Sequence, residues 1–273
     1  MAADGPRPGF LGNLNSDQEA KLQKLWNVLL KAAELPLGQD LNGCVEEPED
    51  STSPTTLTKS PTNSRRASLL GRTQSNVSEK TIPTLTRPYQ QKFMGYLREI
   101  GMGPQETRMV QGALAQISPS ELRVGVLDTL KHDHPDAMLL RFLRARKWDV
   151  CRAFAMMMEA IVWRVKEMHV DEDVMAKGEL HALKQEKSSN PSEQKAGKDF
   201  LAQMRMGKSY VHGTDKLGRP IVVIKVRLHK PGAQSEESLE RFIVHMIESV
   251  RLTLSPPVET AVSNGMLFGP GIC

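Results

Sequence analysis

The sequence predicts an α+β or α/β fold, in which an all-helical region leads into a β-hairpin and one further helix. The hairpin is predicted by a β-prone segment from Met206 to Val226, which contains two turn-forming glycines, Gly213 and Gly218. Amphipathic spacing of apolar residues predicts helices over most of residues 88–183 and again over residues 235–254. The pattern therefore fits a small sheet with most of its helices on the N-terminal side.

The second strand of the hairpin carries the stronger signal. Ile221–Ile224 is an uninterrupted, mostly β-branched apolar run, which is typical of a strand covered on both faces. Pro220 stands at the start of this run, where its missing N–H costs little. Ser209–Val211 supplies the first strand, and the Asp215 carboxylate is expected to close an Asx-turn between the two.

Composition divides the chain into five segments. They are an N-terminal extension with one amphipathic helix (1–35), a Ser/Thr/Pro-rich linker (36–87), an all-helical region (88–199), the hairpin with its following helix (200–262), and a Gly-rich tail (263–273). The helix of the extension has leucines at helical spacing, which gives it one apolar face. That face either packs on its own domain or binds a partner or a membrane, and the spacing leaves both open.

The linker has too few apolar residues to form a packed core. Sixteen of the 36 residues from 51 to 86 are Ser or Thr, so little apolar area is available to offset the entropy of the chain. Within the linker, Arg65-Arg66-Ala67-Ser68 resembles a site for a basophilic kinase. We therefore expect phosphorylation at Ser68 and a kinase as partner, although motifs this short also occur by chance.

Charge, cysteine content and motifs restrict the functional class. The 273 residues carry a net charge of +4, which permits an acidic lipid surface or nucleic acid as partner but requires neither. The three cysteines have no metal-ligand or disulfide spacing and fit a reducing compartment. The sequence contains no evident secretory signal, membrane-spanning run, phosphate loop or nucleophile motif. We expect a cytoplasmic protein that is not an enzyme and uses no cofactor or metal.

The most distinctive helical segment runs from Asp136 to Trp148. Arg146 and Lys147 stand at its C-terminal end, where the helix dipole favours each cation by about 0.3–1 kcal/mol. Two further cations, Arg141 and Arg144, lie one or two turns earlier. The apolar residues between them supply a packing face: Leu139, Leu140, Phe142 and Leu143.

A second amphipathic helix is predicted directly after this segment. Asp149 is expected to cap it, and apolar residues continue at helical spacing from Val150 to Met168. The polar residues 184–198 are expected to form a loop. The chain thus connects several helices before it enters the hairpin.

Two motifs, in this order, resemble the CRAL-TRIO family. The first is Leu139-Leu-Arg-Phe-Leu-Arg-Ala-Arg-Lys-Trp148, and the second is Gly213-Thr-Asp-Lys-Leu-Gly-Arg-Pro-Ile221. The resemblance covers about residues 88–262. Within the family, the chain most resembles the fungal phosphatidylinositol/phosphatidylcholine transfer proteins that have a long N-terminal extension.

The resemblance implies a helical subdomain followed by an α/β lipid-binding domain that encloses one lipid, without covalent chemistry. It implies phosphatidylinositol as the expected ligand and transient contact with a membrane surface. Each lipid CH₂ left in water would cost roughly 0.8 kcal/mol, so such a site must be apolar.

The resemblance also implies particular site residues. Arg146 and Lys147 correspond to a family position that meets an inositol phosphate, and a solvated basic helix end is the alternative. Val211 and Val222 stand where some phosphatidylcholine-binding members carry tyrosines, which disfavours a choline lipid. The residues expected in the lipid pocket are Val211, Val222, Ile224, Phe242 and Met246.

The C-terminal end departs from the family pattern. Pro257–Val262 is expected to begin another strand, but residues 263–273 contain three glycines and one proline, which a central strand does not tolerate. We therefore expect a C-terminally truncated, incomplete CRAL-TRIO domain with one hairpin plus one helix. So small a sheet predicts an exposed apolar patch, impaired lipid binding and a lipid cavity that is absent or partial.

Two functional hypotheses remain open. One is a lipid-binding, phospholipid-transfer module. The other is a protein-interaction module that uses the helical subdomain and the phosphorylatable linker without a lipid. Nucleic acid is not expected as a partner, because the charge is modest, aromatic residues are few, and the apolar residues beside the cations are needed for packing.

Overall fold

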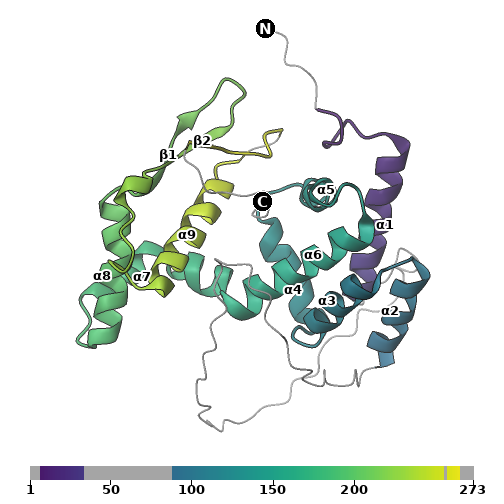
Figure 1. The fold of residues 1–273 in the computed structure, drawn as a ribbon, viewed down its shortest axis with the longest axis horizontal. Coiled ribbons are helices and arrows are strands. Elements are labelled where there is room, and N and C mark those ends of the chain that lie inside the picture. Colours follow the sequence, from purple (N-terminus) through teal and green to yellow (C-terminus); the bar gives the residue numbers. More distant parts are fainter. Residues whose placement is uncertain (1–6, 34–87, 255–256, 265–273) are drawn as a thin grey trace, which may run out of the picture. The chain divides into compact units, whose positions relative to one another are not determined.

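The computed structural model describes residues 7–33, 88–254 and 257–264 (Figure 1). The predicted linker with Ser68 lies outside these residues, as does the predicted tail from residue 265 onward. The predicted fold class is confirmed, because the described chain is rich in helices and contains one small sheet.

The α-helices precede the β1–β2 hairpin along the chain, except for α9. The first eight are α1 (Ser16–Ala32), α2 (Pro88–Glu99), α3 (Pro104–Leu114), α4 (Pro119–Leu130), α5 (Pro135–Ala145), α6 (Val150–Val162), α7 (Ala176–Glu186) and α8 (Pro191–Arg205). Two π-helical segments lie between α6 and α7: η1 (Trp163–Glu167) and η2 (Val170–Met175). The remaining elements are β1 (Ser209–Thr214), β2 (Pro220–Ile224), the 3₁₀ helix η3 (Val226–Leu228), α9 (Glu236–Arg251) and β3 (Val262–Asn264). None of the helices in the described part of the chain has the length and apolarity that crossing a bilayer requires.

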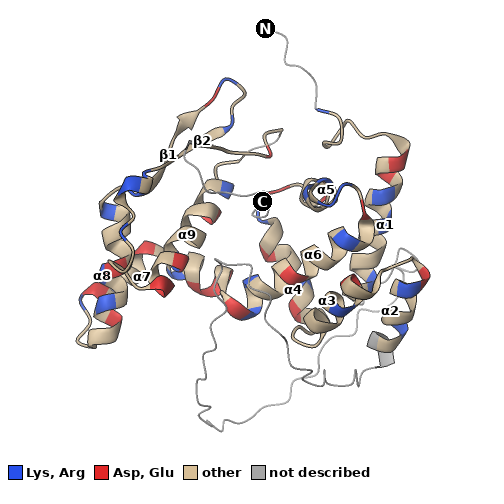
Figure 2. Ribbon diagram, in the orientation of Figure 1, with Lys and Arg blue, Asp and Glu red and all other residues tan. Residues whose placement is uncertain are grey.

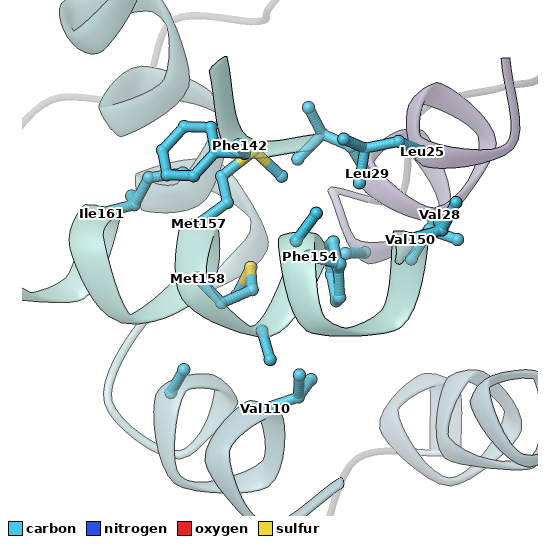
Figure 3. Close-up of a cluster of buried hydrophobic side chains, with 14 of the residues drawn as sticks. Leu25, Val28, Leu29, Val110, Phe142, Val150, Phe154, Met157, Met158 and Ile161 are labelled. Carbon is cyan, nitrogen blue, oxygen red and sulfur yellow. The ribbon is translucent and has the colours of Figure 1, made fainter. Parts of the chain in front are cut away.

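Helix α6 lies in the middle of the main hydrophobic core (Figure 3). Its residues Phe154, Met157 and Met158 are fully buried, and the helix packs against α1, α3, α4 and α5. Burying each such side chain contributes roughly 1.5–3 kcal/mol, so this helix organises the elements around it. Asp149 caps α6 as predicted, since its carboxylate accepts a hydrogen bond from Arg152 N at 3.0 Å.

The α-helical part of this segment ends at Val162, earlier than predicted. The chain continues as η1, in which π-type hydrogen bonds replace the α-type pattern. The apolar spacing up to Met168 therefore indicated a helical segment correctly but did not reveal the change of helix type. The change matters because η1 carries Arg164, which is buried.

Helix α1 packs within the helical core, which decides between the two hypotheses for the N-terminal extension. Asn15 begins the helix through a capping box with Gln18. The Trp26 indole Nε1 donates a hydrogen bond to Asp136 Oδ1 at 2.7 Å, which joins α1 to the start of α5. The buried face, which points toward α6 (Figure 3), consists of Leu22, Leu25, Val28, Leu29 and Ala32.

The prediction of a polar loop over residues 184–198 is wrong, because α8 begins at Pro191. The Asn190 side chain accepts a hydrogen bond from Ser192 N at 3.0 Å, and Pro191 occupies the first turn, where a missing N–H does not matter. Most residues in the first half of α8 face solvent, whereas Phe200 and Leu201 in its second half are buried. Apolar periodicity therefore missed a helix whose start is set by a cap.

The sheet has the strand order β1-β2-β3. The predicted hairpin is confirmed, because β1 and β2 are antiparallel with Val211 opposite Val222. β3 runs parallel to β2, with Val262 opposite Ile221. Residues 263–264 also belong to β3, so the boundary expected after Val262 falls inside this strand.

The hairpin turn is closed in the predicted way. The Asp215 carboxylate accepts hydrogen bonds from the backbone N–H groups of Leu217 and Arg219, both at 2.9 Å. Gly213 and Gly218 flank this turn with φ angles of 61° and 76°, which glycine adopts without steric cost. The turn is therefore specified locally by these few residues.

Candidate functional site

Four cationic side chains lie in or just after α5, and two of them are engaged within the fold. Arg141 pairs with Asp133 in the turn before the helix. Arg144 donates one hydrogen bond to Glu259 Oε2 at 2.7 Å and another to the backbone oxygen of Gly9 at 2.9 Å. Arg144 therefore joins α5 both to the N-terminal segment and to the segment before β3.

The other two, Arg146 and Lys147, have exposed side chains. Neither side chain forms a hydrogen bond or an ion pair with any other residue of the described chain. Lys147 and Trp148 adopt left-handed φ angles of 53° and 65°, and Trp148 N donates to Leu143 O at 2.7 Å, which ends the helix in a tight turn. Two adjacent cations are thus free to meet an anion.

One face of the hairpin collects three of the five residues predicted for the lipid pocket. Val211 and Val222 stand opposite each other, and Ile224 is two positions from Val222 on the same strand, so all three share a face. Val222 is 7% exposed, whereas Val211 is 36% exposed. This face is therefore apolar and only partly covered.

The other two predicted pocket residues, Phe242 and Met246, lie in a separate cluster on α9. The rings of Phe242 and Phe200 meet edge to face, with their centroids 6.3 Å apart, and Met246 packs against the same cluster. These two residues hold α9 against the preceding helices. Their neighbour Ile243 is 40% exposed.

Two hollows in the described residues lie away from these side chains. One, of about 510 Å³, lies between the loop at residues 11–14, α1 and Asp136. The other, of about 280 Å³, lies between α4 and the π-helical segments η1 and η2. None of the five predicted pocket residues lines either hollow.

A charged network joins α9 to the helical region, and the sequence analysis did not predict it. Arg164 of η1 donates two hydrogen bonds to the Glu248 carboxylate of α9, at 2.7 and 3.0 Å. Arg164 also pairs with Asp171 at 3.2 Å. Arg251 bonds to Glu248 at 3.1 Å and to the backbone oxygen of Thr129 at 2.6 Å. These contacts fix the last turns of α9 against the segments around η1.

The ionised state of this buried pair depends on both partners. Burial would raise the pKa of the Glu248 carboxyl, but the hydrogen bonds and charge of Arg164 outweigh it and hold the pKa below its ordinary value. Burial would lower the pKa of the Arg164 guanidinium, but Glu248 more than offsets this and raises it. The sequence offers one hint of this buried ion pair. Glu248 stands one helical turn after the apolar Val244, on the face of α9 that packs inward.

The elements that hold these side chains form a helical region followed by a small α/β region. Residues 107–159 match the family described as CRAL/TRIO, N-terminal domain, and residues 204–263 match the CRAL/TRIO domain. Two segments of the chain therefore match the CRAL-TRIO family, in the order that its two motifs predicted.

Similar proteins occur in fungi and plants. A CRAL-TRIO domain-containing protein of Schizosaccharomyces pombe is 32% identical over 249 residues, which cover 91% of this chain and 51% of that protein. The phosphatidylinositol transfer protein CSR1 of Eremothecium gossypii is 39% identical over 132 residues, or 48% of this chain and 28% of that protein. Patellin-3 of Arabidopsis thaliana is 42% identical over 55 residues, or 20% of this chain and 11% of that protein.

This chain spans about half the length of the fission-yeast relative and a smaller share of the other two. The fission-yeast alignment covers so much of this chain that it must reach well before Thr107, where the family match begins. The similarity thus includes much of the N-terminal part, in which α1 lies.

Proposed function

We propose that this chain binds a phospholipid of the phosphatidylinositol type. One observation carries the proposal: Arg146 and Lys147 are exposed at the end of α5 and form no ion pair within the described residues, in a chain with two segments that match the CRAL-TRIO family. An inositol phosphate is a polyanion, to which adjacent Arg and Lys side chains donate charge-assisted hydrogen bonds. The similarity to a phosphatidylinositol transfer protein supports the same ligand class.

The acyl chains would contact the partly covered face of the hairpin that carries Val211, Val222 and Ile224. Each CH₂ withdrawn from a bilayer must be given an apolar neighbour, because leaving it in water costs roughly 0.8 kcal/mol. In this proposal Phe242 and Met246 contribute by fixing α9 beside the site. The role is that of a carrier that visits a membrane surface and neither makes nor breaks covalent bonds.

We further propose that this chain by itself transfers lipid poorly. The described elements leave Val211 36% exposed and Ile243 40% exposed, so they offer a lipid only partial cover. A carrier with an incomplete apolar enclosure loses part of the free energy needed to extract its ligand.

A vesicle assay tests both proposals, using labelled phosphatidylinositol that moves from donor to acceptor vesicles. It compares this chain with a chimera in which residues 204–263 are replaced by the complete CRAL/TRIO domain of the Eremothecium relative. We expect little transfer by this chain and clear transfer by the chimera. Efficient transfer by the unmodified chain would contradict the partial enclosure.

The headgroup proposal is tested in the same chimera by the double substitution Arg146→Gln and Lys147→Gln. Phosphatidylinositol transfer is expected to fall about ten-fold or more, because two charge-assisted contacts are lost. The matched control is Lys92→Gln with Arg108→Gln, which removes two exposed cations from α2 and α3. Equal rates for all three chimeras would contradict a headgroup role for Arg146 and Lys147.

A second candidate function is a protein-interaction module, which a feature of α4 favours. Val124 and Leu127 stand one turn apart on this helix and are 56% and 65% exposed, so they form a small apolar surface together. In this candidate the helical region and a linker phosphorylated at Ser68 form the docking surface. Failure of both the chain and the chimera to transfer lipid would favour it.

A further inference from the structure

The hairpin region concentrates the positive charge of the chain. From Arg205 to Lys230 there are seven Lys and Arg residues and one carboxylate, that of Asp215. The net charge of this segment is +6, whereas the whole chain carries +4. Figure 2 shows cationic residues at the turn of the β1–β2 hairpin, next to a single acidic one.

Three of these seven cations are engaged within the fold. Arg205 forms a two-pronged pair with Glu186 at 2.6 and 2.8 Å, Arg219 pairs with Asp215 at 2.6 Å, and Lys208 is buried. The other four are Lys216, Lys225, Arg227 and Lys230, and they form no ion pair within the described residues, although the Lys225 ammonium lies over the Tyr210 ring, 5.1 Å from its centroid. This excess charge is available to a partner outside the chain.

Exposed apolar side chains stand among the available cations. Leu217 in the turn is 68% exposed, and Val226 at the other end of the hairpin is 48% exposed. Lys216 precedes Leu217 and Arg227 follows Val226, so each end of the hairpin combines an aliphatic side chain with a cation. The boundary between lipid headgroups and acyl chains suits this combination, because cations meet anionic headgroups there while aliphatic side chains leave water.

We infer that the hairpin docks on an anionic phospholipid bilayer through Leu217 and Val226 and the cations beside them. Nucleic acid fits this surface less well, because Tyr210 is the one Phe, Trp or Tyr residue between residues 205 and 230 that could stack on bases. The inference rests on the proposed function, because docking serves a carrier that must reach a bilayer to exchange lipid. The docking itself requires no transfer.

Flotation of the full chain with vesicles tests the inference, using phosphatidylcholine alone and phosphatidylcholine mixed with phosphatidylserine. Each cation near an anionic surface contributes about a five-fold change in affinity, so Arg227→Gln with Lys230→Gln is expected to weaken binding to the mixed vesicles about 25-fold. Leu217→Asn is expected to weaken binding about ten-fold, because the turn loses its inserted aliphatic group without a change in charge. Added salt should weaken the binding of the unchanged chain.

The matched control is again Lys92→Gln with Arg108→Gln, which lowers the net charge equally and should leave vesicle binding unchanged. Circular dichroism melting should show that all variants fold, since the substituted side chains are exposed. An equal loss in the control, equal binding to both kinds of vesicle, or tighter binding to single-stranded RNA than to vesicles would overturn the inference. Loss of phosphatidylinositol transfer with docking retained would instead count against the proposed function alone.

Discussion

The Glu248 carboxylate lies between the guanidinium groups of Arg164 and Arg251 and is only 4% exposed. Removing one partner of a buried ion pair leaves the other charge without compensation. We therefore expect Glu248→Ala to lower the free energy of unfolding by about 3–5 kcal/mol. Urea unfolding followed by circular dichroism measures this loss.

A control on the same helix separates this effect from a general loss of helix stability. Glu240 is partly exposed and forms no ion pair with any described residue, so Glu240→Ala should change the free energy of unfolding by less than about 0.5 kcal/mol. If the two substitutions cost the same, the buried pair is not the source of the stability.

His245 gives the junction between α9 and the preceding helices a dependence on pH. Burial lowers the pKa of its imidazole, and the partial opposing effect of Glu179 does not restore it. The folded state therefore favours the neutral ring, and its Nδ1 has no hydrogen-bond partner among the described residues. The stability contributed by the neutral ring is present above the unfolded pKa of about 6.5 and declines as the pH falls through the folded pKa.

We expect the free energy of unfolding to fall more in the unchanged chain than in His245→Leu when the pH falls from about 7.5 to about 5.5. Urea unfolding at the two pH values measures the difference. Other acid-sensitive carboxylates, including Glu248, are present in both chains and cancel in the comparison. Identical losses for the two chains would show that His245 does not titrate in this range.

At the scale of elements, α1 behaves as part of the helical core. Leu25 of α1 is completely buried in the core. Leu25→Ala therefore creates a cavity and should lower the free energy of unfolding by about 2–5 kcal/mol. Leu180→Ala on α7 is the matched control, because Leu180 is 64% exposed and should cost less than about 0.5 kcal/mol. A small effect at Leu25 would mean that α1 does not support the fold.

The elements that could be predicted are those specified by local chemistry. The hairpin followed from the β-branched run Ile221–Ile224, the glycines Gly213 and Gly218, and the turn closed by Asp215. α8 was missed because its apolar residues lie only in its second half, while its start depends on the Asn190 cap. The change from α6 to η1 was missed because η1 has only five residues, which is too short for its different period to show in the apolar spacing.

The candidate site was predictable to a similar extent. The family motif pointed to Arg146 and Lys147, and the structure leaves these two cations exposed while it engages Arg141 and Arg144. Sequence alone could not show which of these four cations are exposed and which are engaged. The partner of Arg144, for example, is Glu259, which lies 115 residues away. The network of Arg164 and Glu248 escaped prediction for the same reason, since 84 residues separate its members.

At the scale of the described molecule, several long-range connections tie the helical region to α9 and to the segment before β3, and two of them matter most here. The pair of Arg164 and Glu248 anchors α9, and Arg144 anchors the segment before β3 through Glu259. Arg144 also stacks on the Phe10 ring, with its guanidinium carbon 3.9 Å from the centroid. The proposed headgroup cations therefore lie in a turn that immediately follows a helix fixed to both neighbouring segments.

The central claim is that the hairpin face and the turn after α5 together contact a phospholipid. Photo-crosslinking tests it most directly, with a photoactivatable phosphatidylinositol in vesicles, the full chain, and peptide mapping by mass spectrometry. A probe on the acyl chain should label peptides that contain Val211 or Val222, and a probe on the inositol ring should label the peptide that contains Lys147. Labelling confined to other regions, such as the hollow beside Trp26, or no labelling at all, would contradict the account.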